Sequence, residues 1–237
     1  MAKAVGLIGS MRGKVGNVVY RTRRGVQITS VYQPTVLNPK SARQASSREV
    51  FAVATRMAKA CKLFLRAGLQ SVRPSYECQK FVSGIVPTAN GCFSMVGAIL
   101  TPDYALMANY MAAGELGLGL QARSLSLVEE GEVSFSVSYP ESFAQDEGGN
   151  EVNVGIISCV YCPDVNQAVI QAKAVRDASD LDVTVEVPTV MSGLKVHVYC
   201  FIKQIPTSGN LVPSMDTPWM YPARTSIPIW VGTGTIA

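Results

Sequence analysis

Acidic side chains are almost missing from the first 75 residues. Only Glu49 of the chain's 17 Asp and Glu residues lies there, beside 14 of the 21 Lys and Arg residues, which leaves a net charge of +13. Residues 76–237 hold 16 carboxylates and 7 cations and sum to −9. A segment with so little compensating acid repels itself unless it lies along a polyanion or an acidic protein surface. This polarity predicts a binding or assembly role, and it divides the chain into a basic N-terminal unit, 1–75, and an acidic domain, 76–237.

Histidine is scarce as well, since His197 is the only one in the chain. It lies in the strand-like segment LKVHVYCF and shares a face with Lys195 and Tyr199, so we expect it to point outward. With no acidic partner nearby in the sequence, a Ser-His-Asp or Cys-His catalytic site has no support. Cys159 and Cys162 form a C-x-x-C pair, but a spacing of three in a strand turns the thiols to opposite faces, and one His cannot complete a four-ligand zinc site. We expect no enzyme activity, no catalytic residue, no metal and no cofactor.

Long apolar runs are missing too. The start, MAKAVGLIGSMRGK, holds too short an apolar stretch for a signal peptide, and no segment approaches about 18 uninterrupted apolar residues. We therefore expect synthesis in a cytoplasm, no membrane partner, and six cysteines that are reduced core residues rather than a disulfide framework. The glycines of GLIGSMRGKVG lack the spacing and the Ser or Thr of a phosphate-binding loop. Charged residues make up only 16% of the chain and apolar residues 48%, which predicts a surface that meets other subunits.

Two elements are expected in the basic unit. Residues 17–32 alternate apolar and polar side chains on both sides of Arg24-Gly25, which predicts a β-hairpin. Residues 48–69 repeat with a helical period, which predicts a long helix with Ser46 or Ser47 as its N-cap. Cations take one side of this helix and apolar side chains the other, namely Val53, Ala54, Met57, Cys61, Phe64, Leu65 and Gly68.

Strands dominate the expected structure of the acidic part. Strand-like segments separated by turn signals are 121–128, 132–139, 151–161, 167–174, 181–187, 193–204 and 218–232. Such spacing is typical of an antiparallel β-sandwich or a jelly-roll-like barrel. Before them, 76–86 fits a short helix or a strand, and 103–113 has a helical composition with an alternating face. The expected fold class is mostly β, α+β overall, with an N-terminal β-hairpin and one long amphipathic helix.

A set of cations forms the candidate contact surface. They come from the hairpin, the following loop and one helix face, and are Arg12, Lys14, Arg21, Arg23, Arg24, Lys40, Arg43, Arg48, Arg56, Lys59, Lys62 and Arg66. Cations spread over such elements can cover several phosphates, and Arg suits bidentate contacts with phosphate or carboxylate. The same surface suits the acidic part of a neighbouring subunit, or solvent alone. The sequence holds no base-reading motif, so we expect any contact with single-stranded nucleic acid to be non-specific.

Several segments together resemble an uncharacterised family of proteins, about as long as this chain, from gut-type bacteria and their phages. They are GSMRGKVGNVVYRTRRG near the start, VLNPKSARQASSREVF entering the helix, DYALM and GELGL midway, and GLKVHVYCFIK late in the chain. Members typically open with G-x-x-x-G-K-x-G-N-V-V and continue with N-P-x-T-x-x-Q, where this chain has Ser41 in place of the Thr and a shifted Arg43-Gln44 pair. The resemblance implies β structure at both ends around one helix, a strand at 103–112, and no enzyme activity.

The function expected from these features is structural. We expect a virion-type capsid or coat-like protein that assembles with copies of itself, and whose basic unit contacts packaged genome or an adjacent subunit. Such a protein is made in the host cytoplasm and resides in the virion. The alternative, from a different class, is an intracellular, non-specific nucleic-acid-binding accessory protein of a phage-like element that acts as a small oligomer.

Overall fold

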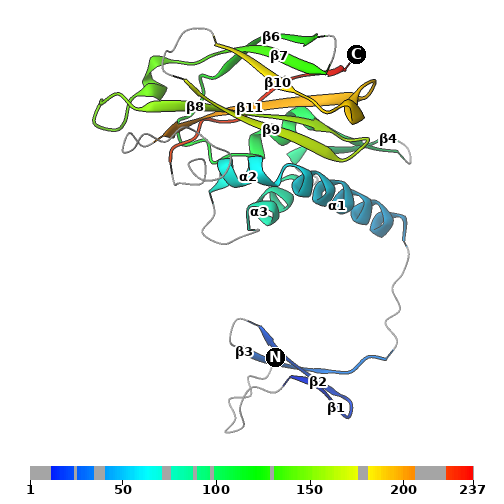
Figure 1. The fold of residues 1–237 in the computed structure, drawn as a ribbon. Helices are drawn as coiled ribbons and strands as arrows, with labels where there is room; N and C mark the ends of the chain where they lie inside the picture. The colour runs from blue at the N-terminus through cyan, green and yellow to red at the C-terminus, as the bar shows by residue number, and fades with distance from the viewer. Residues whose placement is uncertain are drawn as a thin grey trace. The chain divides into compact units, whose positions relative to one another are not determined.

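The computed structural model describes residues 12–23, 26–34, 41–70, 76–87, 90–96, 99–128, 131–175, 181–205 and 223–236. Backbone contacts divide the chain into two compact units, Met1–Ala45 and Ser46–Ala237, whose members can be followed in Figure 1. The boundary that the sequence places at residue 75 follows charge. The boundary by contacts lies earlier in the chain, because the helical residues from Val50 onward pack into the core of the larger unit.

A three-stranded antiparallel sheet makes up the described part of the smaller unit. Strand β1 (Gly13–Val15) pairs with β2 (Val18–Arg23), which pairs with β3 (Val26–Val31). The predicted hairpin is confirmed, because the last residue of β2 pairs with the first of β3 and two residues connect them at the expected place. Gly16 has a φ of 59° between β1 and β2, which glycine reaches without strain.

Two antiparallel sheets face each other in the larger unit. One has the strand order β12-β11-β8-β9 and the other β10-β7-β6. Their strands are β6 (Gln121–Val128), β7 (Glu132–Ser138), β8 (Asn153–Cys162), β9 (Gln167–Val175), β10 (Leu181–Glu186), β11 (Lys195–Ile205) and β12 (Ile229–Thr235). A short pair, β4 (Phe93–Val96) and β5 (Ile99–Pro102), forms a separate two-stranded sheet.

The predicted fold class is confirmed as mostly β and α+β overall, with antiparallel sheets. All strands expected between residues 121 and 204 are present within a few residues of the predicted bounds. The last one differs, because the segment expected to be extended from 218 begins its regular pairing only at Ile229, and residues 218–222 lie outside the described ranges. The described strands form a sandwich and do not close into a barrel.

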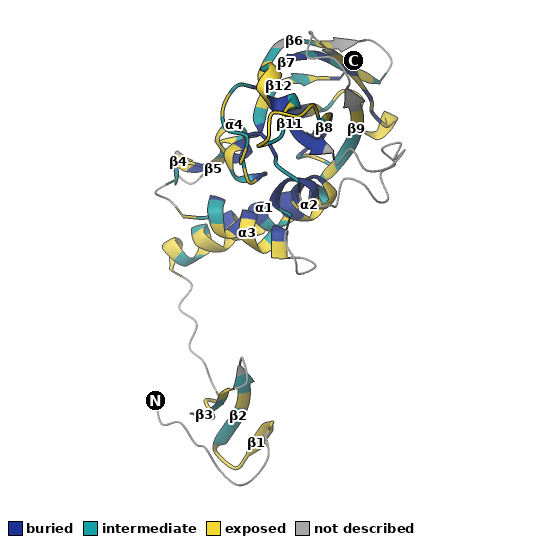
Figure 2. Cartoon of the chain, turned by 90° about the vertical axis from the view of Figure 1, so that its left-hand side faces the viewer, coloured by how far each residue is buried: buried dark blue, intermediate teal, exposed yellow. Residues whose placement is uncertain are grey.

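The four-stranded sheet buries both of its faces. On β11, Val196, Val198 and Cys200 point toward the other sheet, whereas Tyr199 and Phe201 point toward the helices. Alternation along a strand sends neighbouring side chains to opposite faces, so one strand contributes to two cores. The larger unit is therefore built of three layers, a three-stranded sheet, a four-stranded sheet and a layer of helices (Figure 1, Figure 2).

The helical layer consists mainly of α1 (Ala42–Ala60), α2 (Lys62–Leu69) and α3 (Tyr76–Ile85). The predicted long helix is correct in position, but it begins earlier and is interrupted at Cys61. Ser41 Oγ accepts the N–H of Gln44 at 3.3 Å, so the helix is capped one turn or more before the predicted Ser46 or Ser47. None of the described helices is long and apolar enough to span a bilayer.

The segment after β5 is helical rather than extended. α4 (Tyr104–Met107) continues into a 3₁₀ turn, Ala108–Tyr110. The carboxylate of Asp103 accepts two backbone N–H groups of the first turn, at 3.0 and 3.1 Å. The strand that the family resemblance implies for 103–112 is therefore wrong, because the chain carries a local helix cap there. Two further 3₁₀ turns span Glu141–Ala144 and Thr189–Met191.

Candidate interaction surface

Lys14 and Arg21 lie on the same face of the N-terminal sheet. Lys14 pairs with Val19, and Arg21 lies two residues further along β2, so the pleat turns both side chains to one side. Both are exposed. Lys14 Nζ lies 3.4 Å from the ring centroid of Tyr32, and Arg21 donates a hydrogen bond to Ser30 Oγ at 3.4 Å. The hairpin sheet thus presents a cationic face.

The described residues of the N-terminal sheet include none that is buried. Between residues 12 and 34 every described side chain is exposed or half-buried, and both edge strands of the sheet carry open apolar groups. Val15 is 64% exposed and Val31 76% exposed. A small sheet needs a hydrophobic face packed on something to be stable in water. This sheet therefore lacks, within its own described residues, the cover that its strands require.

A second group of cations lies along α1 and α2 and is called here the cationic stripe. Its members are exposed and are Arg48, Arg56, Lys59, Lys62 and Arg66. The opposite side of the same helices is fully buried at Met57, Phe64 and Leu65. The predicted division of this helix into an apolar and a cationic side is confirmed, with Val53 half-buried at the edge. The apolar side is held by the four-stranded sheet, so the stripe is presented on a fixed support.

The structure brings the predicted contact residues together in two sets, one on the hairpin and one on the helices. Arg12 is exposed directly before β1, and Arg43 is exposed near the start of α1. The rest cannot be assigned a place, because Arg24, Lys40 and the side chain of Arg23 lie outside the described residues. Each set is a surface of its own element, and each suits contact with an acidic partner.

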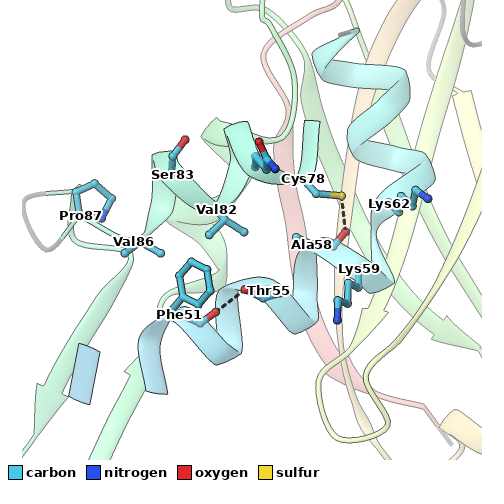
Figure 3. A pocket seen from close by; sticks show the side chains of 11 residues that line it. Phe51, Thr55, Ala58, Lys59, Lys62, Cys78, Val82, Ser83, Val86 and Pro87 are labelled. Atoms are coloured by element: carbon cyan, nitrogen blue, oxygen red, sulfur yellow. Dashed lines mark hydrogen bonds between the residues drawn. The ribbon is translucent and has the colours of Figure 1, made fainter. Parts of the chain in front are cut away.

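An apolar groove adjoins the cationic stripe, between α1 and α3. Its volume is about 710 Å³. One wall comes from α1 and α2, and the other from α3 and the residues after it, with the lining residues Phe51, Thr55, Ala58, Lys59, Lys62, Cys78, Gln79, Val82, Ser83, Val86 and Pro87. Figure 3 shows Phe51, Val82 and Val86 together at one end and the two lysines with Cys78 at the other. The groove thus suits a partner that presents apolar side chains next to a carboxylate.

The sequence alone does not predict this groove. Its wall on α3 follows the spacing of Cys78, Val82 and Val86, which is a helical period of four, but the segment also fitted a strand. Phe51 is 56% exposed, which is unusual for a large apolar side chain of a helix whose other side is buried. The pairing of α1 with α3 is a tertiary feature, so neither segment alone predicts it.

Cys78 ties the two walls of the groove together. Its Sγ donates to the carbonyl oxygen of Ala58 at 3.3 Å, as Figure 3 shows. Burial, with the nearby carboxylate of Glu77 as the second cause, raises the pKa of the Cys78 thiol above its ordinary value. The group is therefore a protonated thiol at neutral pH and serves as a packing and hydrogen-bonding group, not as an activated nucleophile.

His197 is buried, which corrects the expectation that it points outward. Only 6% of it is exposed, and its ring stacks on that of Tyr104 with centroids 4.1 Å apart. It does share a face with Tyr199, as predicted, but that face is covered by the helical layer. Burial, and then the charge of Lys195, lowers the pKa of His197 to about 4, so the imidazole is neutral at neutral pH.

The cysteines divide between the two cores. Cys159 packs with the helices and Cys162 between the sheets, so the predicted opposite orientation of the C-x-x-C pair is confirmed. Cys159 Sγ lies 3.8 Å from Cys61 Sγ, and burial raises the pKa of the Cys159 thiol. All six cysteines are thiols and all but Cys78 are buried. Within the described ranges no cluster of three or more His, Cys, Asp or Glu is placed to hold a metal ion.

Comparison with known proteins identifies no relative, because no protein-family model, no curated protein and no solved structure matches the chain. The function is therefore argued from the surfaces described above.

Proposed function

We propose that the chain is a self-assembling structural protein of the virion type, a capsid or coat-like subunit. The observation that carries this proposal is the N-terminal sheet, in which none of the described residues 12–34 is buried. Ordering a strand costs backbone and side-chain entropy, and this sheet recovers little of that cost by burying its own apolar surface. A neighbouring molecule that covers the sheet supplies the missing burial, and in a homo-oligomer that neighbour is a second copy of the chain.

Charge supports the same proposal. The cationic face of the sheet and the cationic stripe both belong to a segment with one carboxylate, Glu49, while the larger unit carries exposed acidic groups. Glu132 and Glu186 lie directly opposite each other on β7 and β10, and both are exposed. Like charges directly opposite in a sheet destabilise the pair, and a cation from a neighbour relieves that repulsion. Basic and acidic surfaces on one chain therefore favour contacts between copies.

Packaged genome is the second partner in this proposal. The cationic stripe repeats along two helices at spacings that keep its charges on one side, which suits a run of phosphates. In the alternative function, that of an intracellular non-specific nucleic-acid-binding accessory protein of a phage-like element, the same stripe is the main surface. Under the structural proposal the protein is made in a host cytoplasm and resides in the virion.

Electron microscopy of the purified full chain separates the two functions. The structural proposal predicts closed particles or regular arrays, whereas the accessory protein would give small discrete oligomers. The role of the cations is measured in parallel by fluorescence anisotropy with single-stranded DNA at increasing salt. Each phosphate contact adds about 0.7 to the slope of log K against log salt for a single strand. Binding without salt dependence removes the genome from the proposal, and a protein that stays monomeric at high concentration contradicts the proposal as a whole.

A further inference from the structure

A second cavity lies at one end of the four-stranded sheet, away from the groove between α1 and α3. Its volume is about 560 Å³. Segments from five parts of the chain meet there: the β4–β5 pair, the start of α4, the turn after β8, strand β11 and strand β12. Cavities of a few hundred Å³ that several segments line are the usual form of small-molecule sites. The volume lies within the range of small-molecule pockets.

The lining of this cavity includes a residue with a buried polar atom that lacks a partner among the described residues. His197 lines the cavity, is only 6% exposed, and stacks on Tyr104. Its Nδ1 is buried and has no hydrogen-bond partner in the part of the chain that the structure describes. Leaving such a group unsatisfied costs stability, so its presence beside the cavity points to a role beyond packing.

An aromatic ring stands at the edge of the cavity. Trp230 on β12 lines it and is 38% exposed. The pairing of β11 with β12 shifts register between Val198 and Tyr199, next to the position where Tyr199 pairs with Trp230. Such bulges bend the strand and re-aim the neighbouring side chain, and they are frequent beside binding sites. An exposed indole offers an apolar face for stacking and one N–H donor.

The polar groups around this ring favour a neutral ligand with many hydroxyl groups. Two carboxylates, Asp103 and Asp164, line the cavity beside one ammonium group, Lys195. One oxygen of Asp103 already caps α4, whereas Asp164 lies exposed in the turn after β8. A net negative lining disfavours phosphate and carboxylate ligands, because like charges repel. Carboxylates accept hydrogen bonds from hydroxyl groups, and an aromatic face packs against the C–H face of a sugar ring.

We propose that this cavity is a binding site for a neutral sugar unit of a glycan, with Trp230 as the stacking platform and Asp164 as a hydroxyl acceptor. His197 lines the cavity and supports Tyr104 by ring stacking. The site goes beyond assembly, because a subunit with such a cavity can attach to a saccharide. Its test does not depend on the oligomeric state.

The experiment uses the fluorescence of Trp230. The chain has two tryptophans, so Trp219→Phe leaves Trp230 as the only one. Neutral oligosaccharides of glucose, mannose, galactose and N-acetylglucosamine are titrated into this variant at millimolar concentrations. We expect a saturable change in Trp230 emission with at least one of them. No change with any of the four, or a response to adenosine or inorganic phosphate instead, overturns the proposal.

Variants assign the binding to the cavity. By calorimetry of the responding saccharide, Trp230→Ala should weaken binding by about tenfold or more, and Asp164→Asn by several-fold. Tyr76→Ala is the matched control, because Tyr76 is also an exposed aromatic residue, on α3, and its loss should leave the affinity unchanged. Circular dichroism checks that each variant is folded, and if Trp230→Ala does not fold, Asp164→Asn decides. Wild-type affinity in a folded Trp230→Ala or in Asp164→Asn contradicts the site.

Discussion

At the scale of single residues, the buried imidazole of His197 makes stability depend on pH. Its pKa is lowered to about 4 in the folded chain, against about 6.5 in an unfolded one. Between these values the unfolded chain binds more protons, so stability falls as pH decreases through this window. The stability that the neutral imidazole contributes is fully present above pH 6.5. Lowering the pH to below 4 removes at most about 3 kcal/mol of it.

We therefore expect His197→Gln to flatten part of the pH dependence of unfolding. Urea unfolding of the wild type and the variant, at one protein concentration and at several pH values between 6.5 and 4, gives the difference in free energy. Carboxylates titrate in the same range, but they do so in both proteins and cancel in the difference. Equal slopes in the two proteins would show that His197 is protonated without cost and that its burial is not maintained in solution.

Gly68 is a helical glycine whose replacement by alanine should destabilise the fold, which is the reverse of the usual effect. Alanine in place of glycine inside a helix normally stabilises by up to about 1 kcal/mol. Here an added Cβ lies 2.8 Å from the Cβ of Ala112 and clashes with the carbonyl oxygen of Met111. Gly68 is buried in α2, and its carbonyl oxygen accepts the N–H of Ala113 at 3.0 Å, so the two segments cannot separate freely.

We expect Gly68→Ala to lower the free energy of unfolding by about 1 to 3 kcal/mol, measured by urea unfolding. Gln79→Ala on the exposed side of α3 serves as the control and should change stability by less than about 0.5 kcal/mol. A stabilised Gly68→Ala protein would mean that α2 does not pack closely on the segment at residues 111–113.

At the scale of elements, the sequence pattern predicted those strands and turns that depend on residues close together in the chain. The hairpin around Arg24-Gly25 and the strands from β6 to β11 follow from alternation and turn residues, which act over a few positions. The face of His197 also followed from alternation, but its burial did not, because the residues that cover it come from α4. The break at Cys61 and the groove between α1 and α3 depend on packing between helices, which no single segment encodes.

The cationic stripe supports an element-scale prediction. Replacing Arg56, Lys59 and Arg66 by Glu should reduce assembly, seen as fewer particles by electron microscopy, and weaken single-stranded DNA binding, since both partners are acidic in the proposal. Circular dichroism should remain that of a folded protein, because the three side chains are exposed. The matched control carries the same change of net charge at three exposed lysines of the acidic part, Lys80, Lys173 and Lys195. Equal loss in both triple variants would mean that only net charge matters.

The apolar groove gives a second prediction at this scale. Phe51→Ala should reduce assembly while the chain stays folded, because Phe51 is 56% exposed and its contribution comes mainly from a partner that covers it. Leu63→Ala is the control, since Leu63 is 46% exposed on α2 and does not line the groove. Sedimentation velocity compares the two variants with the wild type. Unchanged assembly in Phe51→Ala would exclude the groove as a contact between subunits.

At the scale of the whole molecule, the chain joins two units that differ in how far they bury their own side chains. The larger unit has two cores on the two faces of one sheet and buries its own apolar side chains. The smaller unit has cations on one sheet face and no buried side chain among its described residues. A stable core in one part and an uncovered sheet in the other is the arrangement expected of a subunit that is completed by its neighbours. The charges in the sequence predicted a basic and an acidic part of the chain. That the N-terminal sheet buries no described side chain could be seen only in the fold.

Hydrogen–deuterium exchange of the amides between Val18 and Val31 tests the central claim, that a partner covers the N-terminal sheet. Exchange is followed by mass spectrometry on the full chain at low and at high protein concentration, with β8 and β11 as internal references. The proposal predicts fast exchange in the dilute protein and strong protection at concentrations where the chain assembles, while the reference strands stay protected throughout. Protection of Val18–Val31 that is already complete in a dilute monomer, or fast exchange that persists in the assembled protein, would contradict it.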